Sequence, residues 1–276
     1  MKTWLITGCS SGFGRNLAET LLSEGEQVIV TARKPKTIQH FAKNYPLTAL
    51  CLRLDVTKKD TIDATVNAAI EKFGKIDVLI NNAGYCLRGA VEECTEEEIY
   101  AEFNTNFFGA VRMIQTVLPH MRKAGIGAII NYSSIAALDT SAGSAFYGAA
   151  KCALEGLSCG LRKEVEPLGI KVMVVEPGPF KTDFFDRSID INPNRIAAYD
   201  DTANKRKVKI SDLSKVDIKW CDMGRACKLI TDIIQRPDPP HHILLGSMAV
   251  EIGEKFVKDR AEEIQKWKEA SESLDA

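Results

Sequence analysis

The stretch Thr7-Gly8-Cys9-Ser10-Ser11-Gly12-Phe13-Gly14 decides the fold of this chain. It follows an apolar run over residues 3–7 that has the pattern of a buried strand, and it precedes a helical pattern over residues 15–23. Glycines let a backbone approach a pyrophosphate, and a helix N-terminus offers free N–H groups and the positive end of a dipole. A strand, a glycine loop and a helix in this order predict the first unit of a dinucleotide-binding fold, although the spacing differs from Gly-x-Gly-x-x-Gly.

Short apolar runs recur along the rest of the chain and alternate with longer stretches of helical period. Buried, mostly β-branched strands separated by helices are typical of a parallel sheet joined by right-handed crossovers. We therefore predict a doubly wound, Rossmann-type α/β fold of three layers, in which helices cover both faces of a parallel sheet of about seven strands. The predicted strands are residues 3–7, 27–31, 48–53, 76–81, 128–132, 171–175 and 242–245.

Two regions interrupt this alternation within what we predict to be a single domain over residues 1–276. The segment over residues 181–222 is long for a connection between strands, and connections of this length are usually functional lids or disordered segments. We predict a substrate lid there. Residues 250–276 have the pattern of a charged amphipathic helix, which we expect to pack on the domain or on a partner subunit.

The composition excludes several classes of function. The net charge is −1, so no overall basic field attracts nucleic acid. The eight cysteines form no Cys-x-x-Cys pair and lie at no zinc-finger spacing from a histidine, which indicates free thiols in a reducing compartment and no metal site. No apolar run reaches the roughly 18 residues that a membrane span requires. We therefore expect a cytoplasmic protein without a nucleic-acid, membrane or metal partner.

Tyr147 and Lys151 stand four residues apart in the run Tyr147-Gly148-Ala149-Ala150-Lys151. On a helix this spacing places both side chains on one face. An ammonium group beside a phenol favours the phenolate and lowers a pKa that is ordinarily near 10. A tyrosine tuned in this way is suited to general acid–base catalysis near neutral pH. The pattern also occurs by chance in many helices, so its meaning depends on the surrounding motifs.

Those motifs follow the glycine loop in a fixed order. Asn81-Asn82-Ala83-Gly84 comes after the fourth predicted strand, Ser134 lies thirteen residues before Tyr147, and Pro177-Gly178 comes after the sixth strand. Together with the loop and the Tyr/Lys pair, they resemble the single-domain short-chain dehydrogenase/reductase family. The resemblance covers residues 1 to about 182 and resumes at the last strand. It implies a nicotinamide cofactor bound by Gly8, Ser10, Ser11, Gly12, Phe13, Gly14, Asn82, Ala83, Gly84, Tyr147, Lys151, Pro177 and Gly178.

The end of the second predicted strand bears on the choice of cofactor. A carboxylate there would accept a hydrogen bond from the ribose 2′-hydroxyl of NAD. Ala32 stands where the NAD-using members of the family carry an aspartate, and Arg33 and Lys34 follow it. Arg33 could bind a 2′-phosphate through a charge-assisted contact; the alternative is a solvated surface arginine. We therefore predict that NADP(H) is favoured over NAD(H).

Further cofactor contacts rest on the resemblance. Asp55, followed by Val56, matches the family position that holds the adenine, although a strand-end aspartate that only caps the next helix is the alternative. After Pro177-Gly178, the resemblance implies that the backbone of Phe180 and the hydroxyl of Thr182 contact the nicotinamide carboxamide.

The resemblance also assigns the catalytic groups. Ser134 would hydrogen-bond the substrate carbonyl oxygen, and Tyr147 would exchange a proton with it. Lys151 would bind the nicotinamide ribose and lower the tyrosine pKa. Asn106 would hold a water that links the lysine to solvent; Asn104 is the competing candidate, and the following Asn-x-x-Gly pattern favours Asn106.

The predicted function is that of an NADP-dependent carbonyl reductase or alcohol dehydrogenase. The alternatives are a catalytically silent NADP-binding sensor or scaffold of the same fold, and a nucleotide-sugar epimerase or dehydratase. The family forms dimers and tetramers, which implies a homodimer or homotetramer built on the helices before and containing the Tyr/Lys pair. Apolar residues predict a pocket for a hydrophobic ketone or hydroxysteroid-like compound: Leu87, Leu138, Phe184, Phe185, Ile189 and Tyr199.

Overall fold

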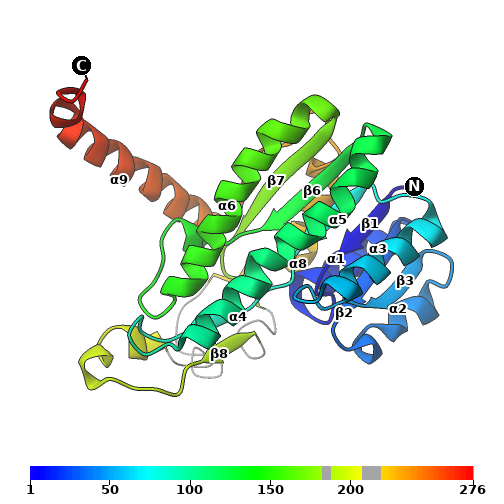
Figure 1. Cartoon of the computed structure of the whole chain (residues 1–276), viewed down its shortest axis with the longest axis horizontal. Coiled ribbons are helices and arrows are strands. Elements are labelled where there is room, and N and C mark those ends of the chain that lie inside the picture. The colour runs from blue at the N-terminus through cyan, green and yellow to red at the C-terminus, as the bar shows by residue number, and fades with distance from the viewer. Residues whose placement is uncertain (182–187, 207–218, 276) are drawn as a thin grey trace.

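The computed structural model describes residues 1–181, 188–206 and 219–275 (Figure 1). Seven strands form one parallel sheet, which confirms the predicted fold. Their order is β3-β2-β1-β4-β6-β7-β9, so the direction of winding reverses between β1 and β4. Such a reversal opens a crevice at the carboxyl ends of the strands. The strands are β1 (Thr3–Ile6), β2 (Gln27–Ala32), β3 (Ala49–Arg53), β4 (Val78–Asn81), β6 (Gly127–Tyr132), β7 (Ile170–Pro177) and β9 (His242–Leu245).

Helices cover both faces of this sheet because successive strand residues point to opposite sides. Ile6 on β1 packs in one core with Leu17 and Ile230, whereas its neighbour Leu5 packs in the other with Val66. The first core lies under α1 (Gly12–Ser23), α2 (Gln39–Asn44) and α8 (Met223–Ile233). The second lies under α3 (Lys59–Phe73), α5 (Phe108–Ala124) and α6 (Ala145–Val165).

Local signals set the ends of several helices. The hydroxyl of Thr95 accepts from the N–H of Glu98, whose carboxylate in turn accepts from the N–H of Thr95, so a capping box starts α4 (Glu96–Asn106). At the other end, α4 breaks off at Asn106 and α5 begins at Phe108. This break lies beside the carboxyl end of β4 and therefore beside the crevice.

A second, smaller sheet was not predicted. The three-residue strand β5 (Cys86–Arg88) pairs in parallel with β8 (Ile189–Ile191), which lies within the predicted lid. Hydrogen bonds flank the pairing, from the Cys86 N–H to the Ser188 carbonyl and from the Asn192 N–H to the Arg88 carbonyl, each 2.8 Å. The lid region is thus tied to the chain that follows β4. Thr182, Phe184 and Phe185 lie outside the described residues.

The predicted C-terminal helix is α9 (Ser247–Glu272). Its first turns pack on the body through Ala249 and Gly253, and the rest projects away from the sheet (Figure 1). Along the projecting part, Val257, Ile264 and Trp267 keep between 57% and 66% of their surface exposed. Among the described residues, no helix is long and apolar enough to span a membrane.

Candidate active site

A cavity of about 860 Å³ lies at the carboxyl ends of the strands, in the crevice that the winding reversal creates. Its volume is typical of a cofactor or ligand site. Gly14, Lys34 and Asn106 do not line it, and Thr182 cannot be placed. The predicted residues that do line it are Gly8, Ser10, Ser11, Gly12, Phe13, Arg33, Asp55, Val56, Asn82, Ala83, Gly84, Ser134, Tyr147, Lys151, Pro177, Gly178 and Phe180.

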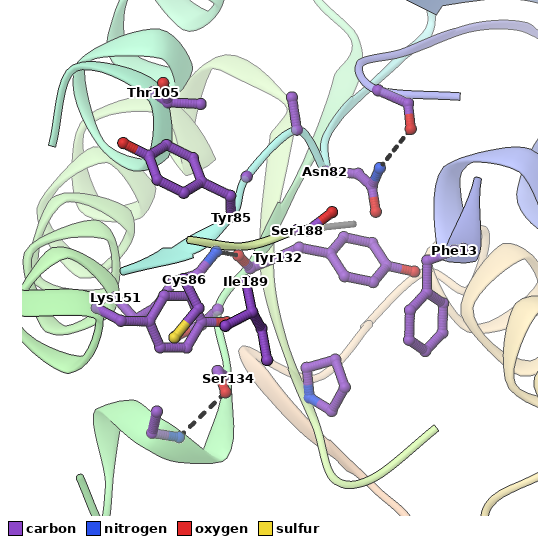
Figure 2. Close-up of a pocket in the computed structure, with 18 of the residues that line it drawn as sticks. Phe13, Asn82, Tyr85, Cys86, Thr105, Tyr132, Ser134, Lys151, Ser188 and Ile189 are labelled. Carbon is purple, nitrogen blue, oxygen red and sulfur yellow. Dashed lines mark hydrogen bonds between the residues drawn. The ribbon is translucent and has the colours of Figure 1, made fainter. Parts of the chain in front are cut away.

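The glycine loop is tightly packed. Gly8 has a φ of 76°, a region that L side chains rarely adopt. A Cβ on Gly14 would come within 2.5 Å of the Gly8 carbonyl oxygen and 2.6 Å of the Asn82 amide nitrogen. The same Asn82 amide donates to the Thr7 and Gly8 carbonyls at 2.9 and 3.2 Å, and Figure 2 draws one hydrogen bond from Asn82 as a dashed line. Gly14 and Asn82 therefore support the loop that lines the cavity, which explains why Gly14 itself lies behind it.

The loop fits the pyrophosphate that a nicotinamide dinucleotide carries. Ser11 stands at the N-cap of α1 in an extended conformation, and its side chain makes no capping hydrogen bond. The N–H groups of the first helical turn are therefore not satisfied by the cap. A helix N-terminus with such N–H groups favours an anion.

Arg33 and Asp55 lie at the end of the cavity that the second strand borders. Ala32, buried at the end of β2, leaves this end without a carboxylate at that position. Partial burial acts to raise the pKa of Asp55, but hydrogen bonds from Thr57 and the charge of Arg33 outweigh it and lower that pKa. Thr57 donates both its N–H and its hydroxyl to the Asp55 carboxylate, at 3.0 and 2.7 Å. Asp55 thus makes local hydrogen bonds as well as lining the cavity.

Ser134, Tyr147 and Lys151 line the same cavity, and Figure 2 labels Ser134 and Lys151. Ser134 follows β6, and its hydroxyl oxygen accepts from the Ala136 N–H at 3.1 Å. Lys151 is buried on α6, donates to the Tyr132 carbonyl at 2.7 Å and lies 5.6 Å from the centre of the Tyr147 ring. The predicted helical spacing of the Tyr/Lys pair is therefore confirmed.

The low pKa expected for Tyr147 is not found in this arrangement, in which the pKa of the phenol is raised. Burial raises the pKa of Tyr147 well above its ordinary value, the Cys86 thiol adds to the rise, and a hydrogen bond with Ser134 opposes it. Burial also lowers the pKa of Lys151 to about 8, although the carboxylate of Glu102 opposes that shift. The loss of hydration around the phenolate outweighs a neighbouring ammonium that is itself partly deprotonated near neutral pH.

Asn106 occupies the break between α4 and α5, and its side chain is engaged by the backbone. Its amide donates to the Tyr85 carbonyl at 2.8 Å, and its amide oxygen accepts from the Tyr85 N–H at 3.0 Å. A Cβ on Gly84 would come within 2.9 Å of this oxygen and 3.7 Å of the Lys151 ammonium. Asn106 thus fixes the chain beside the lysine. Its competitor Asn104 lines the cavity.

Glu102, which sequence reasoning missed, lies fully buried one turn before Asn106. One carboxylate oxygen accepts from the Leu87 N–H at 2.9 Å and from the Asn106 amide at 3.4 Å; the other has no hydrogen-bond partner among the described residues. Burial raises the pKa of Glu102 to about 7, against the Leu87 hydrogen bond and the charge of Lys151. The available signal was its spacing of four from Asn106 on one helical face.

Aromatic rings close the end of the cavity near the glycine loop. Phe13 lies edge-on to Phe180 with ring centres 4.7 Å apart, and its ring centre is 5.2 Å from that of Tyr132. Figure 2 shows Phe13 opposite Lys151 and Cys86 across the cavity. Tyr85, Cys86 and Arg88 line the other end of the cavity. Burial raises the pKa of the Cys86 thiol to about 11, which disfavours a nucleophilic thiolate.

The predicted apolar pocket is only partly formed by the residues named for it. Ile189 on β8 lines the cavity. Leu87 is buried in the body, Leu138 borders a separate groove beside α9, and the Tyr199 hydroxyl bonds the Glu92 carboxylate at 2.6 Å. The reason is the strand β5, because alternation along it turns Leu87 away from its neighbours Cys86 and Arg88.

Outside this cavity, Glu155, Glu176 and His242 bring their ligand atoms within 4.8 Å of one another. Ser133 donates to Glu155 at 2.5 Å, and His242 lies 3.5 Å from Glu176. Burial raises the pKa of Glu155 to about 7, and the hydrogen bond to Glu176 raises the pKa of His242. These mutual contacts account for the cluster without an added ion.

Comparison with known proteins gives consistent matches. The family model described as short chain dehydrogenase matches residues 2–191. Over 245 residues the chain is 40% identical to 3-ketodihydrosphingosine reductase of Bacteroides thetaiotaomicron, covering 88% of this chain and 87% of that protein. A short-chain dehydrogenase from Streptomyces avermitilis superposes with a TM-score of 0.91 at 35% identity, covering 100% of both chains. ElxO with NADP bound superposes with a TM-score of 0.74 at 27% identity, covering 91% of this chain and 99% of that one.

The family match spans most of the chain, and the Streptomyces avermitilis structure superposes on it over the full length of both chains. The glycine loop, Ser134 and the Tyr147/Lys151 pair follow one another along the chain in the order expected from the family resemblance. The chain therefore belongs to the short-chain dehydrogenase family of oxidoreductases.

Proposed function

We propose that this protein is an NADP(H)-dependent oxidoreductase that transfers a hydride between the nicotinamide and a carbonyl compound or secondary alcohol. The observation that carries the proposal is the convergence of Ser134, Tyr147 and Lys151 on a cavity whose other end is the glycine loop. A dinucleotide that spans this cavity would bring its reactive ring to the three side chains.

When bound, the nicotinamide supplies or accepts the hydride. The Ser134 hydroxyl accepts from the Ala136 N–H and is hydrogen-bonded to Tyr147, so a substrate oxygen that enters between the two hydroxyls can accept from both. The raised pKa of Tyr147 keeps its phenol protonated at neutral pH, which suits a proton donor and hence carbonyl reduction. Lys151, fixed by the Tyr132 carbonyl, would bind the ribose and support the phenol through its charge. The Tyr147→Phe experiment described in the Discussion tests this proposal.

Arg33 supports NADP(H) as the preferred cofactor. Arg33 is exposed at the end of the cavity where β2 stops. The last residue of β2 is Ala32, so no carboxylate stands at that position. A relative of known structure, ElxO, holds NADP. A charge-assisted contact between a guanidinium and a 2′-phosphate fits this end of the cavity.

Replacing Arg33 with Ala is expected to weaken NADPH binding by about 10- to 100-fold, the usual range for one charge-assisted hydrogen bond, and to change NADH binding far less. Fluorescence titration of both cofactors measures the preference. Lys36→Ala removes an exposed cation in the turn that follows and controls for net charge. Equal affinities for NADPH and NADH in the unmodified protein would remove the NADP assignment.

For the substrate we propose a hydrophobic carbonyl compound. Ile189 and Met248 give the cavity apolar walls beside its polar groups. The relative from Bacteroides thetaiotaomicron is named for a ketone, 3-ketodihydrosphingosine. That compound belongs in a substrate panel together with hydroxysteroids and medium-chain ketones.

The alternatives are less well supported. A silent NADP-binding sensor has no need of Ser134, Tyr147 and Lys151 in one cavity, yet all three line it. A nucleotide-sugar epimerase or dehydratase needs room for a second large substrate, whereas the whole cavity measures about 860 Å³. Turnover of ketones that depends on Tyr147 separates the main proposal from the sensor.

We also propose that the chain forms a homo-oligomer in the cytoplasm, in which α9 packs on a second copy. None of the eight cysteines forms a disulfide, as expected in a reducing compartment. Along α9, spacings of three, four and seven residues place Phe256, Val257, Ile264 and Trp267 on the side by which Ala249 and Gly253 pack on the body. We call these four residues the outer apolar face of α9.

The charges of α9 favour a second copy over a membrane. Lys255–Asp259, Lys258–Glu262 and Lys268–Glu272 are ion pairs within the helix, so both signs alternate along its length. A helix bound to an anionic lipid surface carries mainly basic residues on its polar face. The exposed part is roughly 20 residues and 30 Å long, enough to contribute much of the ~800 Å² per partner of a stable interface.

Ile264→Glu is expected to shift the protein to a smaller assembly, because it places a charge in the middle of the outer apolar face. Light scattering after size-exclusion chromatography measures the mass. Gln265→Glu adds the same charge at the next residue, which is also exposed, and should leave the mass unchanged. The same mass for both variants would contradict the proposed interface.

A further inference from the structure

Arg88 places an uncompensated positive charge at the substrate end of the cavity. It lines the cavity and is half-buried at the end of β5. Its Nε has no hydrogen-bond partner among the described residues and essentially no access to solvent. Within residues 1–181, 188–206 and 219–275, no carboxylate forms an ion pair with its guanidinium. A partly desolvated guanidinium without a carboxylate partner is costly, so a site that keeps one is expected to use it.

The surroundings of Arg88 connect it to the catalytic tyrosine. Cys86 and Arg88 are two residues apart on β5, so their side chains point to the same side of the strand. The Cys86 thiol is hydrogen-bonded by Arg88 and by Ser144. Ser144 is the N-cap of α6, three residues before Tyr147. The charge of Arg88 also acts on the Tyr147 phenol. The guanidinium therefore lies beside the place where the proposed function puts a substrate carbonyl.

The charged groups nearby do not neutralise it. Lys151 is a second cation on the same wall of the cavity. Asp190 on β8 lines the cavity too, but it forms no ion pair with Arg88. Glu102 is engaged by Leu87 and Asn106. The substrate end of the described cavity thus carries an excess of positive charge.

We propose that Arg88 binds an oxyanion group of the substrate, a carboxylate or a phosphate, while Ser134 and Tyr147 hold its carbonyl oxygen. This inference rests on the proposed function and narrows its substrate to an acidic ketone with an apolar body. The reaction stays balanced: the hydride goes to the carbonyl carbon, the proton of Tyr147 goes to the oxygen, and the oxyanion is unchanged. A planar guanidinium can donate two parallel hydrogen bonds to such a group.

The main experiment compares medium-chain keto acids with their methyl esters as substrates for NADPH-dependent reduction. The unmodified enzyme should prefer the acid in kcat/KM. In Arg88→Gln the ratio of acid to ester should fall by about 10- to 100-fold, the range for one charge-assisted pair. Arg88→Lys keeps the charge without the planar fork and should recover part of the ratio. Thermal unfolding and NADPH titration verify that the variants fold and bind cofactor.

A purely electrostatic role for Arg88 on Tyr147 gives a different result. In that case Arg88→Gln would lower kcat/KM for the acid and the ester by the same factor, so their ratio would stay constant. The pH dependence of kcat/KM would shift. That outcome overturns the proposal. Ketones with a carboxylate at increasing distance from the carbonyl, and their phosphate analogues, identify which oxyanion reaches Arg88. An amine-bearing ketone that is reduced faster than the acids would also contradict it.

A binding measurement separates failure of this inference from failure of the proposed function. Medium-chain alkanoates, which carry a carboxylate and no ketone, are titrated calorimetrically into the NADP⁺-loaded protein. Binding that is lost in Arg88→Gln supports the oxyanion site even if no ketone is turned over. Binding that is equal in both proteins overturns it, whether or not ketones are reduced.

Discussion

Tyr147→Phe is expected to lower kcat/KM for ketone reduction by roughly 10²- to 10⁴-fold, the usual contribution of a positioned general acid. The substitution removes one oxygen from a side chain whose ring packs beside Lys151 and keeps the shape of the ring. NADPH affinity should change little, because Lys151 keeps its hydrogen bond to Tyr132. Steady-state kinetics with a ketone panel and cofactor titration measure the two effects separately.

Tyr100→Phe is the matched control. Tyr100 lies on α4 with 64% of its surface exposed, so the same chemical change there should leave turnover unchanged. If both variants reduce ketones at the rate of the unmodified protein, the proposed acid–base role is lost. If neither the unmodified protein nor the variants show turnover while all bind NADPH, the silent-sensor alternative gains support.

Gly14→Ala is expected to reduce NADPH affinity by at least about 100-fold, which corresponds to about 2.7 kcal/mol. A methyl group would come within 2.5 Å of the Gly8 carbonyl oxygen, which belongs to the backbone and cannot rotate away. The loop would have to move, and this movement would disrupt the hydrogen bonds by which the Asn82 amide holds it. Overpacking of this kind also costs about 1–3 kcal/mol of folding stability.

Gly224→Ala provides the comparison, because it changes another glycine near the start of a helix. At that position the nearest atom to the added Cβ is the Asp222 carboxylate oxygen at 3.5 Å, an ordinary contact. Helix propensity favours the change by up to about 1 kcal/mol. Urea unfolding and cofactor titration should therefore distinguish the two variants clearly. Normal NADPH binding in Gly14→Ala would contradict the role assigned to the loop.

The sheet was predictable because its strands are buried on both faces. Val28, Ile29 and Val30 are consecutive, apolar and buried, and β1, β4, β6 and β7 contain similar runs. The short strands β5 and β8 gave no such signal. Three residues are too few to show a period, and their pairing depends on a contact between segments about a hundred residues apart.

The candidate site was predictable as far as motifs reach. The glycine loop, Ser134 and Tyr147/Lys151 were named from motifs and their resemblance to a known family, and the structure brings them to one cavity. The direction in which the pKa of Tyr147 shifts was not predictable, since it depends on how much water the fold removes from the phenol. Glu102 and Arg88 were missed for a related reason. Charged residues in a sequence are ordinarily on the surface, and only the fold shows that Glu102 is fully buried and that the Nε of Arg88 is shielded from solvent.

Because β5 pairs with β8, deuterium exchange can measure how often the substrate end of the cavity opens. A two-stranded sheet of three-residue strands is marginal by itself, so it should separate far more often than the large sheet. Each separation exposes the Cys86 amide, which otherwise donates to the Ser188 carbonyl. The exchange rate of that amide therefore reports how often the wall that carries Cys86 and Arg88 opens. A ligand that bridges the wall and the catalytic tyrosine would slow the exchange while leaving the amides of β4 unaffected.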